Sequence, residues 1–284
     1  MPTGGSTPPR PQRAEELAAG VPPPSGSTAA DAAPGGGVRP EQAATRAACG
    51  GIVFGGAQWT TVIDYPGVVA STLFTVGCNL RCPFCHNPEL VDPERLAGAL
   101  DLPAVVERLR ERVGFLDGVV ITGGEPTIHP GLAAFATSLK DLGYLVKLDT
   151  NGTRPEVVRR LLEERRADYI AMDVKAPLDR YAELAGTDVD IGAIERSIAG
   201  IVEAAPEHEF RTTVAPTLGQ EDILRIAELL REAGARRFFL QPYRVPETGL
   251  LDRTWMQRSA LSLGEIESAW SGIRMWFADG GVRA

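Results

Sequence analysis

The 284-residue chain predicts an α/β fold, namely a partial (β/α)6 TIM-like barrel with parallel strands inside and helices outside. Two observations predict it. Short apolar or β-branched runs alternate with amphipathic helical patterns along the chain, and the segments between them lack hairpin signals. Strands and helices that alternate in this way build parallel sheets. The pattern leaves an open, doubly wound sheet as the alternative.

Six segments are expected to form the strands. They are rich in Val, Ile, Leu, Phe and Thr, and their length suits buried strands of a parallel sheet. They span residues 69–75, 117–122, 144–149, 168–173, 210–214 and 236–241.

Helices are expected between these strands. The clearest pattern places apolar residues at 223, 226, 227 and 230 before Gly234, which predicts one buried face and a glycine stop. Pro155 suits the first turn of another helix. The remaining helical patterns lie at about residues 92–113, 131–142, 178–204 and 261–276.

The beginning of the chain has a different composition. Pro and Gly supply 16 of the first 40 residues, which exceeds the roughly 25 to 30% level typical of low-complexity disorder. We therefore expect residues 1–50 to form a disordered Pro/Gly/Ala-rich tail and residues 51–284 to form one domain. The tail has no long apolar run, which argues against a secretory signal or a membrane span.

Charge and cysteine content narrow the function. The formal net charge is -8, which argues against nucleic-acid binding because such binding depends on clustered cations. Three of the four cysteines lie within eight positions, a metal-site pattern and not a disulfide scaffold. We expect a cytoplasmic protein that binds neither nucleic acid nor a membrane.

The three clustered cysteines, Cys78, Cys82 and Cys85, form a Cys-x3-Cys-x2-Cys run after the first predicted strand. Ferredoxin-type clusters normally use four thiolates, so three would leave one iron of a cubic cluster open to a small molecule. The alternative is a zinc site completed by His86, but adjacent Cys85 and His86 would have difficulty ligating one tetrahedral ion. Cys49 could in principle be a fourth ligand, although we favour a spare thiol.

Other polar groups follow the later strands. In a parallel barrel the carboxyl ends of the strands meet at one rim, so these side chains are expected to face the cysteines. Capped turns and solvated surface charges are the competing interpretation. The residues are Gly123, Gly124, Glu125 and Pro126 after the second strand, Asp149 at the third, Asp173 and Lys175 at the fourth, and Arg244 after the sixth.

These motifs resemble the radical S-adenosylmethionine enzymes and, within them, the activating enzymes of glycyl radical enzymes. The resemblance rests on the cysteine run with Phe84, on residues 86–90 (HNPEL), on residues 63–67 (IDYPG) and on residues 123–126 (GGEP). It covers about residues 52–245. The chain is most similar to activating proteins of anaerobic ribonucleoside-triphosphate reductases.

The resemblance implies two cofactors. One is a [4Fe-4S] cluster on the three cysteines, and the other is S-adenosylmethionine, whose amino and carboxylate groups bind the open iron. One electron then breaks the sulfur–C5′ bond and leaves a 5′-deoxyadenosyl radical. The resemblance also implies that Phe84 and residues 123–126 bind S-adenosylmethionine, with the GGEP loop at its amino group.

Further site residues are implied in the same way. Asp149, Thr150 and Asp173 correspond to a monovalent cation site beside S-adenosylmethionine, and Asp173 and Lys175 approach that cofactor. Arg244 stands where related activases often carry a histidine, which weakens its assignment to the cofactor site. His86 lies next to the last cysteine and could line the cleft or make a local turn contact.

The expected reaction is the removal of a hydrogen from a glycine Cα of a partner enzyme. The resemblance implies anaerobic ribonucleotide reductase as the partner and reduced flavodoxin or ferredoxin as the electron donor. Two alternatives keep the cofactor chemistry, namely activation of another glycyl radical enzyme such as pyruvate formate-lyase, or a small-molecule substrate such as a purine-like or tetrahydropterin-derived compound. A third is a noncatalytic, zinc-stabilised interaction module.

Overall fold

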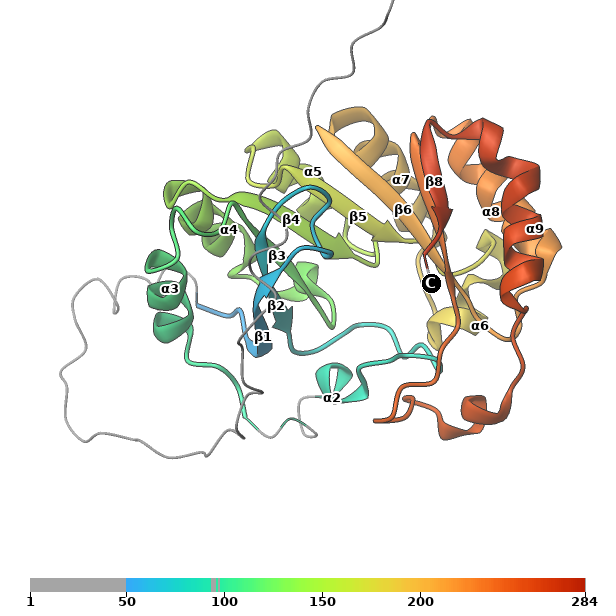
Figure 1. Ribbon diagram of the computed structural model, residues 1–284, viewed down its shortest axis with the longest axis horizontal. Coiled ribbons are helices and arrows are strands. Elements are labelled where there is room, and N and C mark those ends of the chain that lie inside the picture. Colours follow the sequence, from blue (N-terminus) through green and yellow to red (C-terminus); the bar gives the residue numbers. More distant parts are fainter. Residues whose placement is uncertain (1–49, 93–95, 97, 284) are drawn as a thin grey trace, which may run out of the picture. The chain divides into compact units, whose positions relative to one another are not determined.

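The computed structural model describes residues 50–92, 96 and 98–283. The predicted tail, apart from Gly50, lies outside the described residues, as does Cys49. Within the described ranges, eight strands form one sheet whose spatial order follows the chain from β1 to β8. Figure 1 shows α4, α5, α7, α8 and α9 along the outside of this sheet. The predicted α/β fold with a largely parallel sheet is confirmed.

All six predicted strands are present, and each pairs in parallel with its neighbour. Two further strands flank them. The strands are β1 (Phe54–Thr61), β2 (Ala70–Thr75), β3 (Gly118–Gly123), β4 (Leu145–Thr150), β5 (Tyr169–Asp173), β6 (Glu207–Val214), β7 (Arg237–Pro242) and β8 (Asp279–Val282).

The edge strands correct the prediction of a sheet with six strands and no hairpin. β1 pairs antiparallel with β2 through an irregular register, and β8 extends the parallel sheet beyond β7. Both strands contain paired glycines, and most of their residues are only partly buried. An edge strand of this kind lacks the continuous apolar run by which a buried parallel strand is recognised.

Apart from α2, which no helical pattern predicted, the helices lie where periodicity placed them, but several are shorter than expected. They are α2 (Pro88–Val91), α3 (Leu102–Arg110), α4 (Leu132–Asp141), α5 (Pro155–Glu163), α6 (Tyr181–Ala185), α7 (Ile191–Ala204), α8 (Gln220–Glu232) and α9 (Leu263–Ile273). Short 3-10 turns lie at Pro126–Ile128, Leu178–Arg180, Arg253–Gln257 and Arg274–Trp276.

Local capping explains the shorter helices. Within the helix predicted at 92–113, α3 begins at Leu102, because Asp101 caps it by accepting from the Ala104 backbone N–H. The segment 178–204 divides into a 3-10 turn, α6 and α7, because Gly186 ends α6 in the left-handed conformation. No helix in the described ranges combines the length and apolar character needed to cross a bilayer.

Successive side chains along each strand point alternately to the outer, helix-covered side and to the inner side of the sheet, and the two sides differ in composition. Residues such as Leu73, Ile121 and Phe210 face the helices and are completely or almost completely buried in the main core. The inner side of the sheet holds a small apolar cluster around Tyr65 and Tyr169 near the amino ends of the strands. Charged side chains occupy the inner side above it, which places them beneath the rim formed by the carboxyl ends.

Candidate active site

A cavity of about 230 Å³ lies at the carboxyl ends of the parallel strands. Most of the residues predicted for the site form its wall. The predicted residues that line it are Cys78, Cys82, Phe84, Cys85, Gly123, Gly124, Glu125, Asp149, Asp173 and Lys175, together with His86 and Thr150. The sheet thus brings together side chains from several separate segments of the sequence.

Two predicted residues lie elsewhere. Pro126 is buried and begins the 3-10 turn behind Glu125, so it supports the loop without forming the cavity wall. Arg244 is exposed and is not among the residues that line the cavity. His86 lines it, and its Nε2 has no hydrogen-bond partner among the described residues. Burial lowers the pKa of His86, which favours the neutral imidazole.

The cysteine loop is held by two distant segments. The Arg81 backbone N–H donates to the Ala185 carbonyl at 2.8 Å, at the end of α6. From the other side, the Asp252 backbone N–H donates to the Pro83 carbonyl at 3.0 Å. Phe84 is buried and packs against Trp255, with ring centroids 5.9 Å apart. The loop therefore has a defined conformation although only part of it is helical.

The three cysteines are free thiols that share this cavity. Burial raises the pKa of Cys78 to about 12 and that of Cys82 to about 11, and it also raises the pKa of Cys85. Buried thiols of this kind become thiolates when a metal supplies compensating positive charge. The thiols therefore fit an iron-sulfur cluster.

The zinc alternative has less support. Among residues 50–92, 96 and 98–283, no group of three or more His, Cys, Asp or Glu side chains is arranged to hold a metal ion. A single zinc ion would need its ligands gathered around one point at about 2.0 to 2.3 Å. An iron-sulfur cluster would be held by Cys78, Cys82 and Cys85, which all line the cavity, and these thiolates would not need to converge on one ion.

Glycines 123 and 124 pack the GGEP loop directly against the cysteine loop. A Cβ added to Gly124 would lie 2.0 Å from the Gly77 carbonyl oxygen, and one added to Gly123 would lie 2.3 Å from the Thr75 nitrogen. Gly123 also has a φ of 113°, which favours glycine. The Glu125 N–H donates to the Gly77 carbonyl at 2.9 Å. The two glycines thus set the distance between the loops.

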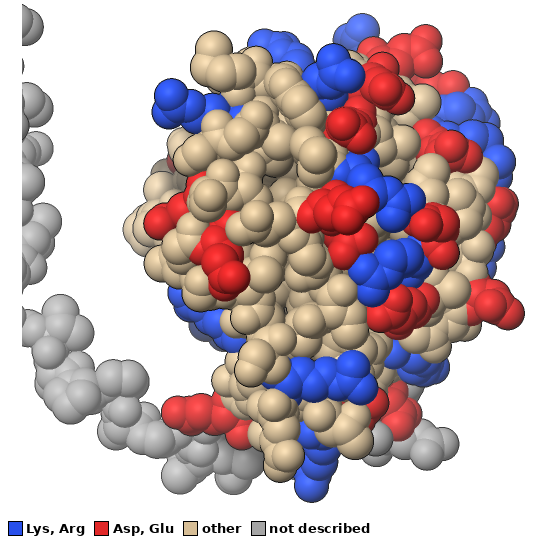
Figure 2. Space-filling model, turned by 90° about the vertical axis from the view of Figure 1, so that its right-hand side faces the viewer, with Lys and Arg blue, Asp and Glu red and all other residues tan. Residues whose placement is uncertain are grey.

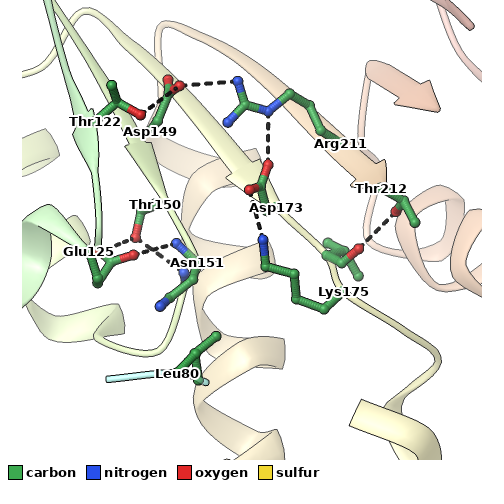
Figure 3. Close-up of polar contacts among 12 residues, drawn as sticks. Leu80, Thr122, Glu125, Asp149, Thr150, Asn151, Asp173, Lys175, Arg211 and Thr212 are labelled. Carbon is green, nitrogen blue, oxygen red and sulfur yellow. Dashed lines mark hydrogen bonds and ion pairs between the residues drawn. The ribbon is translucent and has the colours of Figure 1, made fainter. Parts of the chain in front are cut away.

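Glu125 connects the GGEP loop to the end of β4 (Figure 3). Its side chain is 1% exposed. One carboxylate oxygen accepts from Thr127 and from the Thr150 hydroxyl at 2.8 Å, and the other accepts from the Asn151 backbone N–H at 2.7 Å. Burial raises the pKa of Glu125, and these hydrogen bonds act in the opposite direction.

The resemblance implies that Glu125 binds the amino group of S-adenosylmethionine, so replacing Glu125 by Gln should weaken that binding while leaving iron content unchanged. The amide NH2 would face the Thr127 or Asn151 donors, and the charge available to the cofactor ammonium would be lost. Loss of a hydrogen bond to a charged group costs roughly 1.5 to 3 kcal/mol, or about tenfold to a hundredfold in affinity. Calorimetric titration of cluster-loaded protein measures this, and unchanged affinity would remove Glu125 from the binding site.

A chain of charged side chains crosses the inner side of the sheet (Figure 3). Arg211 on β6 donates to Asp149 at 3.1 Å and to Asp173 at 2.9 Å. Lys175 donates to Asp173 at 2.9 Å, and Lys147 pairs with Asp149. Burial alone would raise the pKa values of both aspartates, but the neighbouring cations more than offset it and hold both below their ordinary values.

Arg211 and Lys147 were not predicted as site residues. The available signal was a charged residue within a predicted buried strand, since a buried charge requires a partner. Arg211 also gives Asp149 and Asp173 a positive partner from this chain. Thr150 is engaged with Glu125. A monovalent cation at this position therefore stays a prediction from the resemblance.

Comparison with known proteins decides the family. The Radical SAM superfamily profile matches residues 72–240, which include all three cysteines and the strands β3 to β6. The chain belongs to the radical SAM superfamily. A protein of Methanocaldococcus jannaschii whose name assigns it to the glycyl-radical enzyme activating enzymes is 34% identical over 180 residues, covering 61% of this chain and 72% of that protein.

Other relatives of this radical SAM protein carry the names of different enzymes. The 7-carboxy-7-deazaguanine synthase of Methanothermobacter thermautotrophicus is 32% identical over 168 residues, covering 55% of this chain and 65% of the synthase. Among solved structures, Streptococcus suis SuiB bound to S-adenosylmethionine shares the fold with a TM-score of 0.58 at 15% identity, covering 74% of this chain and 48% of SuiB.

The family match and the cavity agree on the cofactors. The chain is a radical SAM enzyme, and the family match supports a [4Fe-4S] cluster and S-adenosylmethionine as its cofactors. The comparisons confirm the resemblance to this superfamily and, within it, to activating enzymes of glycyl radical enzymes.

Proposed function

We propose that this radical SAM enzyme generates a glycyl radical on a partner enzyme, and that the partner is an anaerobic ribonucleoside-triphosphate reductase. One observation carries the proposal. A single cavity joins three reduced thiols to the Glu125 loop and to the Asp173–Lys175 pair, in a chain that is 34% identical to a protein named as a glycyl-radical activating enzyme.

The chain's own residues have separable tasks in this proposal. Cys78, Cys82 and Cys85 hold the cluster, which when bound supplies the electron that cleaves S-adenosylmethionine. Glu125 accepts a hydrogen bond from the methionine ammonium, because its buried carboxylate lies on the loop that packs against the cysteine loop. Asp173 and Lys175 contact the polar groups of the nucleoside end.

The partner side of the proposal follows from the chemistry of glycine. A glycine Cα has no side chain to obstruct the approach, and its radical is delocalised along the backbone. The glycine loop of the partner must enter the cavity, whose lining includes Phe84 and His86. Reduced flavodoxin or ferredoxin is the proposed electron donor.

A small-molecule substrate is the second candidate. The 32% identity to a 7-carboxy-7-deazaguanine synthase supports it. In that case a compact heterocycle, and not a peptide loop, would occupy the cavity beside S-adenosylmethionine. The two candidates differ in what the same experiment detects.

Anaerobic incubation of the cluster-loaded enzyme with the reductase, S-adenosylmethionine and a reductant tests the proposal. We expect a glycyl doublet in the electron paramagnetic resonance spectrum of the reductase and one 5′-deoxyadenosine per radical formed. A reductase whose radical-bearing glycine is replaced by alanine is the control and should give no doublet. A signal with pyruvate formate-lyase but not with the reductase would reassign the partner. Turnover with a purine-like compound, without any glycyl signal, would refute the activase.

A further inference from the structure

The charged chain beneath the cavity continues toward the opposite end of the barrel. Glu209 lies two residues before Arg211 on the same face of β6 and is 1% exposed. Arg283, which follows β8, donates to both of its carboxylate oxygens at 2.9 and 2.8 Å. Tyr169 donates its hydroxyl to Glu209 at 3.0 Å. Arg211 lies 3.8 Å from Glu209.

Arg211 therefore has three acidic neighbours, but it hydrogen-bonds to only two of these three. Its guanidinium hydrogen-bonds to Asp149 and Asp173 on the cavity side, whereas its distance of 3.8 Å to Glu209 is longer than a hydrogen bond. Glu209 has its charge already neutralised by the two parallel bonds from Arg283, a geometry that makes strong arginine–carboxylate pairs. Arg283 is itself fixed, because its guanidinium lies 3.4 Å from the centroid of the Phe239 ring. Figure 2 shows that lysine, arginine and acidic side chains intermix on one outer face of the molecule.

We propose that Arg283 is a positioning residue for the cofactor site, acting from the far end of the barrel. By neutralising Glu209, it leaves Arg211 free to hold Asp149 and Asp173 in place below the cavity. Without Arg283, Glu209 becomes a buried carboxylate whose nearest cation is Arg211. The Arg211 guanidinium then moves toward Glu209 and away from Asp149 and Asp173. This inference rests on the proposed function, because it assumes that S-adenosylmethionine lies beside Asp149 and Asp173.

A double-mutant cycle distinguishes this role from general destabilisation. Arg283→Ala should weaken S-adenosylmethionine binding about tenfold, a size typical of groups that orient a ligand from behind. Glu209→Gln should bind with nearly wild-type affinity, because Arg283 is 40% exposed and water can solvate it. The double variant should also bind with nearly wild-type affinity, since a neutral amide at position 209 cannot attract Arg211. Losses caused by destabilisation would instead accumulate.

Arg237→Ala is the matched control. Arg237, the first residue of β7, pairs with Glu207 and Asp279 and also contacts the Tyr169 hydroxyl, but its ion pairs are not with Glu209. The control should leave both bonds from Arg283 to Glu209 intact and should not change the affinity. Unchanged binding in Arg283→Ala, or a double variant as weak as Arg283→Ala, would overturn the proposal.

A crystal structure of cluster-free Arg283→Ala provides a test that needs no cofactor. The distance from Arg211 Nη1 to Glu209 should shorten from 3.8 Å to hydrogen-bond length, with loss of the bond to Asp149. An unmoved guanidinium would refute the positioning role. If the wild-type protein fails to bind S-adenosylmethionine while Arg211 moves in the variant, the proposed function fails and the structural coupling stands.

Discussion

Replacement of Cys82 by alanine is expected to remove both the iron-sulfur cluster and S-adenosylmethionine cleavage. Cys82 is the most deeply buried of the three cysteines, and it lies in the part of the loop that α6, Leu251 and Asp252 hold in place. With two cysteines left, a second iron loses its protein ligand. Iron and sulfide analysis after anaerobic reconstitution, together with 5′-deoxyadenosine release, measures the loss.

The control for this experiment is the cysteine outside the run. Cys49→Ala should retain the cluster, because we interpret Cys49 as a spare thiol. Cys82→Ala should still fold, since the loop is anchored by backbone hydrogen bonds that do not involve the Cys82 side chain. Normal reductive cleavage in Cys82→Ala, or loss of the cluster in Cys49→Ala, would contradict the proposed ligand set.

The strands and the rim could be predicted from the sequence because both follow from local patterns. A buried strand shows a short run of about four to eight apolar residues in succession, and the motifs of the site follow those strands directly. The edge strands could not be found in this way. β8 consists of Asp279, two glycines and Val282, and it becomes a strand because β7 offers it unpaired backbone groups.

The inner charges were missed for a different reason. In β6, residues 207, 209 and 211 are charged, whereas residues 208 and 210 are buried aromatic rings. The predicted strand began at residue 210, so it left out the charged residues 207 and 209 and with them the alternation. The partners of Arg211 also depend on sheet order, since Asp149 is 62 residues away in sequence. Sequence spacing cannot show which carboxylates a buried arginine meets.

Replacement of Arg211 by methionine should produce the largest loss of stability among the inner residues. Methionine keeps much of the volume but leaves Asp149 and Asp173 with one cation fewer in a buried site. Removing one partner of a buried ion pair costs about 3 to 5 kcal/mol in the free energy of unfolding. Urea denaturation of the cluster-free protein at pH 7 measures this loss, and Arg225→Met, at an exposed ion pair with Asp179, should change stability by less than about 0.5 kcal/mol.

The loss of stability in Arg211→Met should also depend on pH in a defined direction. In the wild-type protein the pKa values of Asp149 and Asp173 lie below their ordinary values, so their stabilising contribution is complete at neutral pH and is lost only as the pH falls through those low values. Without Arg211, each aspartate keeps only its lysine partner, so the cations offset burial less and both pKa values rise above those of the wild-type protein. The folded variant then takes up protons at a higher pH than the folded wild-type protein does, so it loses less stability than the wild type as the pH falls. The difference in free energy of unfolding between wild type and Arg211→Met should therefore be larger at pH 7 than at pH 5. An equal difference at both pH values would show that Arg211 does not control the ionisation of the two aspartates.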